Sequence, residues 1–543
     1  MTETAASRWS ALSQYHSRYL RTAIDCSQLT IPSLIPESDM YEGSSGMSDN
    51  QLPSLYQGSG ARNLNGLSAK LLLALYPPSQ PFFRLVIHEG KMESYMQDQL
   101  RAGRQEEEVK SRMDMALASV ERDILKKLDE LQARPALFEL IKHLICGGNG
   151  LIYVGEDGIR MYSLRSFRTH RDPEGNLTEI VIRERVSREF IPPEMLDGDD
   201  DDSSDTPVDL YTWIKFNLDK DRPADRPAVQ WYQEYGGKQI PGSAGFSQDI
   251  DTNPWICCRL LRAANEAYGR GIVEEALGDL QSLEALTMSV VQGSLISTKA
   301  IGLCNPNGVT RADVLARAEN GAIVSGNAAD VEFLQVQKSA DMSVALQTMQ
   351  LIERRLNFTF LANEATTRDA ERVTAEEIRL MAEQLEAGLG GVYSILAHEL
   401  QLPLIKRIVY MMTASGESPP IPPEIISPQI TTGLEAIGRG NDRQRLTNFL
   451  QTVAASLGPE QFLQYINPTE LIRRFAASDG IETAGLVKEE QQLQAEQAQQ
   501  QQLSLEQSLT EGAIRNGATG PSQQAPAPTG GGQPTRTNVP TAV

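Results

Sequence analysis

The stretch that decides the fold is IVEEALGDLQSLEALTMSV, residues 272–290. Its apolar residues recur every three or four positions, which is the spacing of one helix face, so the pattern predicts a helix over 270–297. A second helix is predicted over 340–361. Between them, residues 298–338 contain turn signals such as NPNG at 305–308. The sequence therefore predicts a helical hairpin that carries a compact insert.

The chain before this hairpin shows two kinds of pattern. Up to about residue 135, stripes at helical spacing predict helices, most clearly over 62–75 and 106–131. From 150 to 262, short β-branched and aromatic runs alternate with turn residues and predict a β-rich subdomain. The predicted strands are 151–154, 178–185, 208–216, 229–235 and 255–261. Cys257 and Cys258 lie in the last of these runs and are expected to be buried.

The chain after the hairpin begins with a polar stretch, 363–372, that lacks apolar periodicity. Thr374 and Glu377 fit a capping box, which predicts the start of a helix that continues to about residue 412. Glycine and proline weaken a helix interior, so this helix should be kinked. The residues expected to kink it are Gly388, Gly390, Gly391 and Pro403. A small helical unit follows over 430–480, and the Gln-rich, then Gly- and Pro-rich end is predicted to be largely disordered.

Composition narrows the class of protein. A chain of 543 residues has room for roughly three to four domains. Its hydrophobic fraction of 40% and charged fraction of 22% are globular values. The net charge of −21 argues against binding of DNA or an anionic membrane by bulk charge. No apolar run approaches the length of a membrane span, no secretory signal is visible, and the 5 cysteines are interpreted as reduced thiols.

The sequence lacks the motifs of common catalytic centres. The nearest stretch to a P-loop, GLEAIGRG at 433–440, has Arg439 and Gly440 where the motif requires Lys and then Ser or Thr. His398 and Glu399 lack the second histidine of the zinc motif HExxH, and no GxSxG elbow occurs. We therefore predict that the protein is not an enzyme, with no catalytic, cofactor-binding or metal-binding residues and no cofactor.

One acidic cluster is a candidate metal site. Carboxylates at this density can hold Ca²⁺ or Mg²⁺, but the alternate spacing and distal glutamate of an EF-hand are missing. A block of like charges is usually a solvated loop, which is the interpretation preferred here. Its members are Glu194, Asp197, Asp199, Asp200, Asp201, Asp202 and Asp205.

The order of these elements resembles the portal, or head-to-tail connector, proteins of short-tailed bacteriophages, specifically the podovirus group with a self-encoded RNA polymerase. The resemblance extends over about residues 20–480 and does not include the acidic cluster or the Gln-rich tail. The strings that carry it are QLTIPSLIP (28–36), GARNLNGLSAKLLLALYP (60–77), YGRGIVEEALGDL (268–280), RVTAEEIR (372–379), LGGVYSILAHELQLPL (389–404) and GLEAIGRG (433–440).

The resemblance implies an α+β, mostly α, portal-type fold. Its domains would be a wing at 1–268 with the β-rich subdomain 150–262, stem helices at 269–297 and 339–362, a small α/β clip at 298–338, a channel loop at 363–373, a long kinked wing helix at 374–413, a helical crown at 414–485 and a polar, largely disordered tail at 486–543.

The resemblance also implies a function and partners. The protein would form a homo-oligomeric ring, normally of twelve subunits, at one capsid vertex of the virion, after assembly in the host cytoplasm. Double-stranded DNA would pass through the ring during packaging and ejection. The ring would dock the large terminase ATPase and later a tail adaptor or gatekeeper, and it would contact scaffold, capsid and internal core proteins. No membrane is involved.

Two groups of site residues follow from this assignment. Clip docking is assigned to Asn305, Asn307, Arg311 and Arg317, because the insert has four basic and four acidic residues and its neutral surface suits protein contact. The DNA-channel loop is assigned to Arg368, Asp369, Glu371 and Arg372. Two other functions stay open: another ring-forming phage structural protein, such as a tail adaptor, and a soluble enzyme of unknown chemistry.

Overall fold

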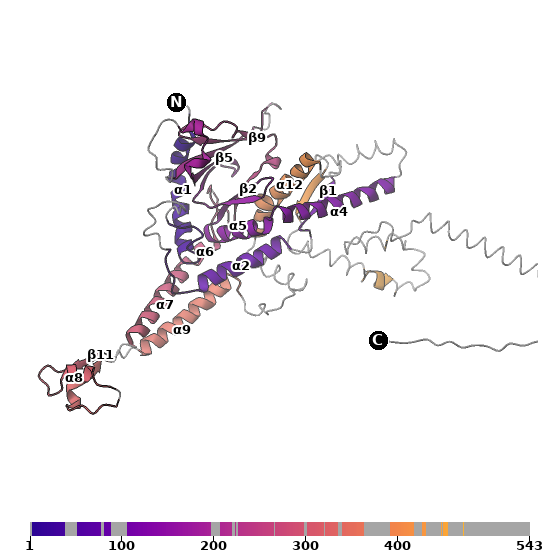
Figure 1. Ribbon diagram of the computed structural model, residues 1–543. Helices are drawn as coiled ribbons and strands as arrows, with labels where there is room; N and C mark the ends of the chain where they lie inside the picture. Colours follow the sequence, from indigo (N-terminus) through magenta and orange to yellow (C-terminus); the bar gives the residue numbers. More distant parts are fainter. Residues whose placement is uncertain are drawn as a thin grey trace, which may run out of the picture. The chain divides into compact units, whose positions relative to one another are not determined.

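The structure is a computed structural model of the full chain. It describes residues 3–37, 52–77, 81–87, 106–196, 207–219, 223, 226–264, 266–297, 301–319, 321–334, 339–362, 391–416, 426–430, 447, 449–453, 455 and 471. The chain divides into two compact units, Met1–Ile437 and Gly438–Val543. All the helices and strands described below belong to the first unit, and Figure 1 labels many of them.

The N-terminal helices match the predicted apolar stripes. They are α1 (Ala5–Gln28), α2 (Ser59–Leu75), α4 (Glu106–Glu130) and α5 (Ala133–Gly147). The Thr4 side chain accepts a hydrogen bond from the Ser7 backbone N–H and caps α1. Gly148 ends α5 in the left-handed region, with φ 73°. The helices predicted over 62–75 and 106–131 are confirmed.

Two antiparallel sheets form the β-rich part. The strands are β2 (Asn149–Val154), β3 (Ile159–Tyr162), β4 (Phe167–Arg171), β5 (Leu177–Val186), β6 (Val208–Phe216), β7 (Val229–Tyr235), β8 (Lys238–Gln239), β9 (Gly245–Ser247) and β10 (Trp255–Arg259). One sheet has the order β10-β2-β3, and the other has the order β4-β5-β6-β7-β8 with β9 also paired to β7. The five predicted strands are all present, as β2, β5, β6, β7 and β10. Cys257 and Cys258 are buried in β10, as expected.

The predicted hairpin is also present. It consists of α6 (Ile272–Glu275), α7 (Leu277–Ser297) and α9 (Ser339–Thr359), with a break between α6 and α7 at Ala276 that the apolar stripe did not indicate. The insert between α7 and α9 contains β11 (Ile301–Cys304), α8 (Ala312–Ala316) and β12 (Val331–Leu334), and β11 pairs with β12. It is a small α/β unit, as predicted.

A large apolar cluster connects these helices. It contains the buried faces of α2, α4 and α5, residues of β2 and β10, the start of α7, the end of α9, and the helices near residue 400. The hairpin is therefore anchored in the same core as the N-terminal helices. A separate cluster lies between α1 and the strands, around Phe167, Ile180 and Ile214.

The long helix predicted over 374–413 is described only from residue 391. There it consists of α11 (Val392–Leu396), a π-helical turn (Ala397–Gln401) and α12 (Leu402–Ser415). Proline has no N–H to donate, so Pro403 interrupts the hydrogen-bond ladder next to this widened turn. Gly391 precedes α11 with φ −67°. The remaining residues expected to cap or kink the helix, Thr374, Glu377, Gly388 and Gly390, lie outside the described residues.

The crown predicted over 414–485 was expected to be helical, but it contains one strand, just before the helical unit predicted over 430–480. Residues Ile426–Ile430 form β13, which pairs antiparallel with β1 (Phe83–Ile87) through contacts such as Phe83 opposite Ile430. The Leu85 backbone N–H also donates to Glu121 Oε1 at 2.8 Å. Neither strand was predicted, because each is short and gains stability only from a partner far away in the sequence. Most of the predicted crown, the GLEAIGRG stretch and the tail lie outside the described residues.

Candidate functional site: the hairpin and its insert

The two long helices of the hairpin, α7 and α9, run side by side and antiparallel (Figure 1). Leu280 and Leu283 of α7 are buried with Ile352 and Leu356 of α9. Arg355 Nη2 donates to Asp279 Oδ1 at 2.6 Å near one end of this contact. Toward the other end, a Cβ at Gly293 would lie 2.7 Å from Met342 Cε, so this glycine allows the helices to approach closely.

Polar contacts fix the base of the hairpin to the segment that leads into α2. The Glu284 carboxylate accepts from the backbone N–H groups of Tyr56 and Gln57, at 2.9 and 3.1 Å. Ser59 Oγ donates to Glu353 Oε1 at 3.0 Å, so α9 is held at the same place as α7. The hairpin is therefore positioned by side chains as well as by its apolar core.

The outer surface of the hairpin is unusually apolar. Large apolar side chains are exposed on both long helices, up to 77% for Phe358. A helix that is apolar on several faces is normally buried by further partners, and exposed apolar patches mark contact sites. The exposed residues are Met288, Val291 and Leu295 on α7, and Val344, Leu346, Leu351 and Phe358 on α9.

Asp330 organises the loops of the insert. Its Oδ2 accepts from the backbone N–H groups of Val309 and Thr310, at 2.9 and 3.2 Å. The Thr310 hydroxyl accepts from the Asn327 N–H at 2.7 Å, which connects the two turn signals of the sequence. Gly308 is required here, because a Cβ at this position would lie 2.5 Å from the Asp330 carboxyl carbon. Hydrogen bonds within the insert therefore hold its surface loops in place.

The predicted docking residues of the insert are exposed, but they are not equivalent. Arg311 and Arg317 flank α8 at its two ends. Asn305 Oδ1 accepts from the Asn307 N–H at 3.1 Å, so Asn305 also has a structural role in its turn. Large apolar side chains accompany them, with Val309 at 83% and Ile323 at 103% exposure. These apolar residues were not predicted, because isolated apolar positions in a turn-rich stretch form no periodic signal.

A buried ion pair connects β10 to the π-helical turn. Arg259 Nη2 donates to Glu399 Oε1 at 2.6 Å, and the Arg259 backbone N–H donates to Glu399 Oε2 at 2.9 Å. The Arg259 side chain is only 5% exposed. Glu399, which the sequence showed beside His398, is therefore part of a structural clamp in the described fold.

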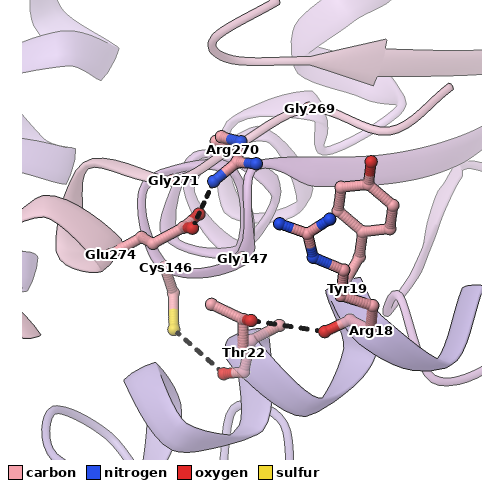
Figure 2. A pocket seen from close by; sticks show the side chains of 10 residues that line it. Arg18, Tyr19, Thr22, Cys146, Gly147, Gly269, Arg270, Gly271 and Glu274 are labelled. Atoms are coloured by element: carbon pink, nitrogen blue, oxygen red, sulfur yellow. Dashed lines mark hydrogen bonds and ion pairs between the residues drawn. The ribbon is translucent and has the colours of Figure 1, made fainter. Parts of the chain in front are cut away.

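A small pocket lies between α1, the end of α5 and residues 269–274 (Figure 2). Arg270 in this pocket is already paired, since it donates to Glu266 at 2.6 Å and to Glu274 at 2.7 Å. Burial raises the pKa of the Cys146 thiol at the pocket wall to about 12, so the reactive thiolate is scarce at neutral pH. The Arg270 and Glu274 charges are therefore satisfied within the pocket, and the Cys146 thiol is not activated.

The remaining candidate sites concern metals, a membrane span and the channel loop, and the structure describes only part of the chain. That part contains no group of three or more His, Cys, Asp or Glu residues arranged to hold a metal ion. Its helices include none that is long and apolar enough to cross a bilayer. The channel-loop residues Arg368, Asp369, Glu371 and Arg372 lie outside it, as do Asp197–Asp205 of the acidic cluster.

The described residues form a mixed helical and stranded fold whose hairpin exposes large apolar side chains on both long helices, as contact sites between chains commonly do. The family model described as "Bacteriophage head to tail connecting protein" matches residues 2–487. The chain belongs to this family of phage head-to-tail connectors.

Its similar relatives are portal proteins of podoviruses. The portal protein of Escherichia phage T7 is 37% identical over 91% of this chain and 90% of its own length. The portal protein of Pseudomonas phage phiKMV is 30% identical over 96% of this chain and 98% of its own length. A chain from the neck of a native gene transfer agent particle, solved with C12 symmetry, matches at 13% identity over 78% of this chain and 91% of its own, with a TM-score of 0.34.

Proposed function

We propose that the protein is the portal of its phage, a closed ring of identical subunits, normally twelve, at one capsid vertex of the virion. DNA is packaged into the head and ejected from it through the ring. The observation that carries this proposal is the family match over residues 2–487, together with a portal relative that is matched over 90% of its own length. The exposed apolar surface of α7 and α9 supports it, because a ring would bury that surface.

Each part of the chain then has a place in the portal. Residues 1–268 and the helix at 374–413 form the wing, α7 and α9 form the stem, the insert 298–338 is the clip, 363–373 is the channel loop and 414–485 is the crown. Packaging requires a motor, which is the large terminase ATPase. Scaffold, capsid and internal core proteins are further partners, and rings assemble in the host cytoplasm.

One image separates this proposal from a soluble enzyme. Negative-stain microscopy of the purified full chain should show rings with a central hole. Separate globules at micromolar concentration would contradict the portal assignment and would favour a soluble protein. A tail adaptor would also form rings, so the second measurement is assembly into capsid precursors, which a portal enters and an adaptor does not.

The clip is proposed as the docking surface for terminase and then for the tail adaptor. Val309 and Ile323 support this role, because they are large apolar side chains that are exposed to solvent instead of packing inside the insert. The double variant Val309→Glu with Ile323→Glu should form normal rings but lose adaptor binding in a pull-down. Arg317→Ala, at the end of α8, tests separately whether the predicted polar docking residues contribute to adaptor binding. Adaptor binding equal to wild type in the double variant would remove the docking assignment.

The channel loop is proposed as a weak DNA contact through Arg368 and Arg372. Two arginines per subunit, beside Asp369 and Glu371, could contact phosphates without strong binding, and each contact should be salt-sensitive. Phage that carries Arg368→Ala with Arg372→Ala should assemble portals but package slowly or lose packed DNA. Packaging and retention equal to wild type across a range of salt would contradict this role. Local pairing of the arginines with the two acidic residues is the competing explanation.

A further inference from the structure

Asn307 and Gly308 form an Asn–Gly pair on the surface of the insert. They follow Pro306 in the turn that leads from β11 toward α8, where Asn307 is exposed and Gly308 is half-buried. Asparagine is among the thermolabile residues of proteins, and a following glycine has no Cβ to hinder approach to the asparagine amide. The pair is therefore a candidate site for a change in covalent structure.

The reaction to consider is spontaneous deamidation. The Gly308 backbone nitrogen attacks the side-chain carbonyl carbon of Asn307 and closes a succinimide ring. The side-chain nitrogen leaves as ammonia and takes up the proton that the Gly308 nitrogen loses. Water then opens the ring at either of its two carbonyl carbons, which gives aspartate or isoaspartate. The net reaction consumes water and releases ammonia, and it replaces a neutral amide by a carboxyl group that is ionised at neutral pH.

Local structure protects two other Asn–Gly pairs of the chain. Asn65 lies inside α2, where the N–H of the following residue donates within the helix and the backbone is held away from the side chain. Asn149 is 3% exposed in β2, and its amide is already bound: Oδ1 accepts from the Gly269 N–H at 2.7 Å, and Nδ2 donates to the Gly269 carbonyl at 2.9 Å. Asn320 and Asn516 also precede glycine but lie outside the described residues.

Asn305, the other asparagine of this turn, restrains the reaction and cannot undergo it. It precedes Pro306, whose nitrogen carries no hydrogen and therefore cannot become the ring nitrogen. The Asn305 backbone carbonyl accepts from the Gly308 N–H at 3.0 Å, and Asn305 Oδ1 accepts from the Asn307 N–H at 3.1 Å. These bonds must open before the Gly308 nitrogen can attack, so the reaction proceeds through local opening of an exposed turn.

The product of the reaction changes the loop that Asp330 organises. Gly308 packs against the Asp330 carboxyl group, which also binds the N–H groups of Val309 and Thr310. A carboxylate at position 307 places a like charge beside this contact, and like charges repel. Isoaspartate in addition lengthens the backbone between residues 307 and 308 by one carbon, which displaces Gly308 from Asp330. The charge of the insert changes from 4 − 4 = 0 to 4 − 5 = −1.

We propose that Asn307 deamidates spontaneously in the folded protein and thereby turns a neutral residue of the insert into an acidic one. The reaction depends only on the local structure of the turn. Its consequence for docking rests on the proposed function of the insert as the clip. A clip that has deamidated before it meets the tail adaptor should bind more weakly, because the new carboxylate would be buried at the contact without a partner.

The first test is peptide mapping by mass spectrometry after incubation of the purified full chain at neutral and at mildly alkaline pH. Asn307 should be converted to aspartate and isoaspartate, and faster at the higher pH, because the attacking nitrogen must lose its proton. Asn65 and Asn149 of the same molecules should keep their amides. The chain unfolded in denaturant is the control, in which all three should react. An Asn307 amide that persists in the folded chain, or equal loss at the three positions, would overturn the proposal.

The second test changes the turn and leaves the reacting pair intact. Asn305→Ala removes the Oδ1 acceptor of the Asn307 N–H, so the turn should open more often and Asn307 should deamidate several-fold faster. Asn65 in the same variant serves as the internal control and should still keep its amide. A rate at Asn307 equal to that of the wild-type protein would contradict control of the reaction by this turn.

The third test measures the consequence for docking. Asn307→Asp supplies one product of the reaction directly, and rings of this variant should retain less tail adaptor in a pull-down than freshly prepared wild-type rings. Equal retention would overturn the docking consequence. Failure of fresh wild-type rings to bind any adaptor would instead count against the proposed function of the clip. Mass spectrometry of Asn307 needs no adaptor, so the two proposals can fail separately.

Discussion

At the scale of single residues, the Arg259–Glu399 pair is the clearest case of a charge that the fold must satisfy. Glu399 meets both the guanidinium and the backbone N–H of Arg259, and its side chain is 15% exposed. Removing one partner leaves the other charge buried and unpaired, which is strongly destabilising. The clamp therefore fixes the π-helical turn against β10.

We expect Glu399→Ala to destabilise the subunit by about 3–5 kcal/mol, because Arg259 would then be buried without its carboxylate. Thermal unfolding followed by tryptophan fluorescence should show a midpoint several degrees lower. Arg262→Ala is the control: Arg262 is 3.8 Å from the same carboxylate but is 49% exposed, so its loss should change little. If the two variants lowered the midpoint equally, the Arg259–Glu399 pair would contribute no more to stability than the exposed Arg262.

Two buried histidines predict how stability depends on pH. Burial lowers the pKa of His16 to about 4 and that of His143 to about 3, although the Leu164 carbonyl, 2.9 Å from His16 Nε2, opposes the shift for His16. The folded protein thus holds both imidazoles neutral, whereas the unfolded chain protonates them below about pH 6.5. Stability is complete above that pH and is lost as the pH falls toward the folded pKa values.

At pH 5 each buried histidine should lower the unfolding free energy by about 2 kcal/mol relative to pH 7. His16→Gln can still donate to the Leu164 carbonyl, so it should unfold with a smaller drop in midpoint between pH 7 and pH 5. The exposed His170, changed to Gln, is the control and should keep the wild-type drop. An unchanged drop in His16→Gln would mean that other groups control the acid sensitivity.

At the scale of elements, the glycines after α5 and α12 show what close packing against other backbone adds to the requirement for glycine. Gly148 after α5 and Gly416 after α12 have φ of 73° and 74°. A Cβ at Gly148 would lie 2.3 Å from the Arg270 carbonyl carbon, whereas a Cβ at Gly416 would meet nothing within 4 Å. The left-handed conformation costs an alanine roughly 1–2 kcal/mol at either position. Only Gly148 adds a clash with backbone.

Gly416→Ala should therefore lower the unfolding free energy by about 1 kcal/mol, and Gly148→Ala by several times as much, because the chain at Arg270 would have to move. Thermal midpoints of the two variants measured side by side test this. Since Arg270 leads into α6, the Gly148 variant should also assemble poorly. Similar midpoints would indicate that residues 269–271 adapt without cost.

Elements with a strong local period were predictable, and those that depend on distant contacts were not. The helices α2, α4 and α9 follow apolar stripes in the sequence, and β6 and β7 have the predicted bounds. By contrast, β1 and β13 are five residues each and pair across the chain. For the site, the insert was located from its turn signals, but Val309 and Ile323 were missed because exposure is a property of the fold.

At the scale of the whole molecule, charge and assembly must be considered together. A net charge of −21 per chain becomes 12 × −21 = −252 in a ring of twelve. An assembly of this sign repels phosphate groups at long range, and salt screens that repulsion beyond roughly 8–10 Å. DNA should therefore pass through the proposed channel without being held, since the local arginines offer only weak contacts.

The net charge also predicts how strongly assembled rings bind free DNA. A short duplex should bind the rings weakly at physiological salt, and the little that binds should depend only shallowly on salt, because few counterions are released. Fluorescence anisotropy of a labelled duplex measures both quantities. The Arg368→Ala with Arg372→Ala variant should lower the residual binding further, since it removes the proposed phosphate contacts while the acidic surface stays. Tight binding that falls steeply with salt concentration is typical of roughly six to ten phosphate contacts. That result would contradict a channel surface that repels DNA. It would indicate a basic surface that forms only in the ring.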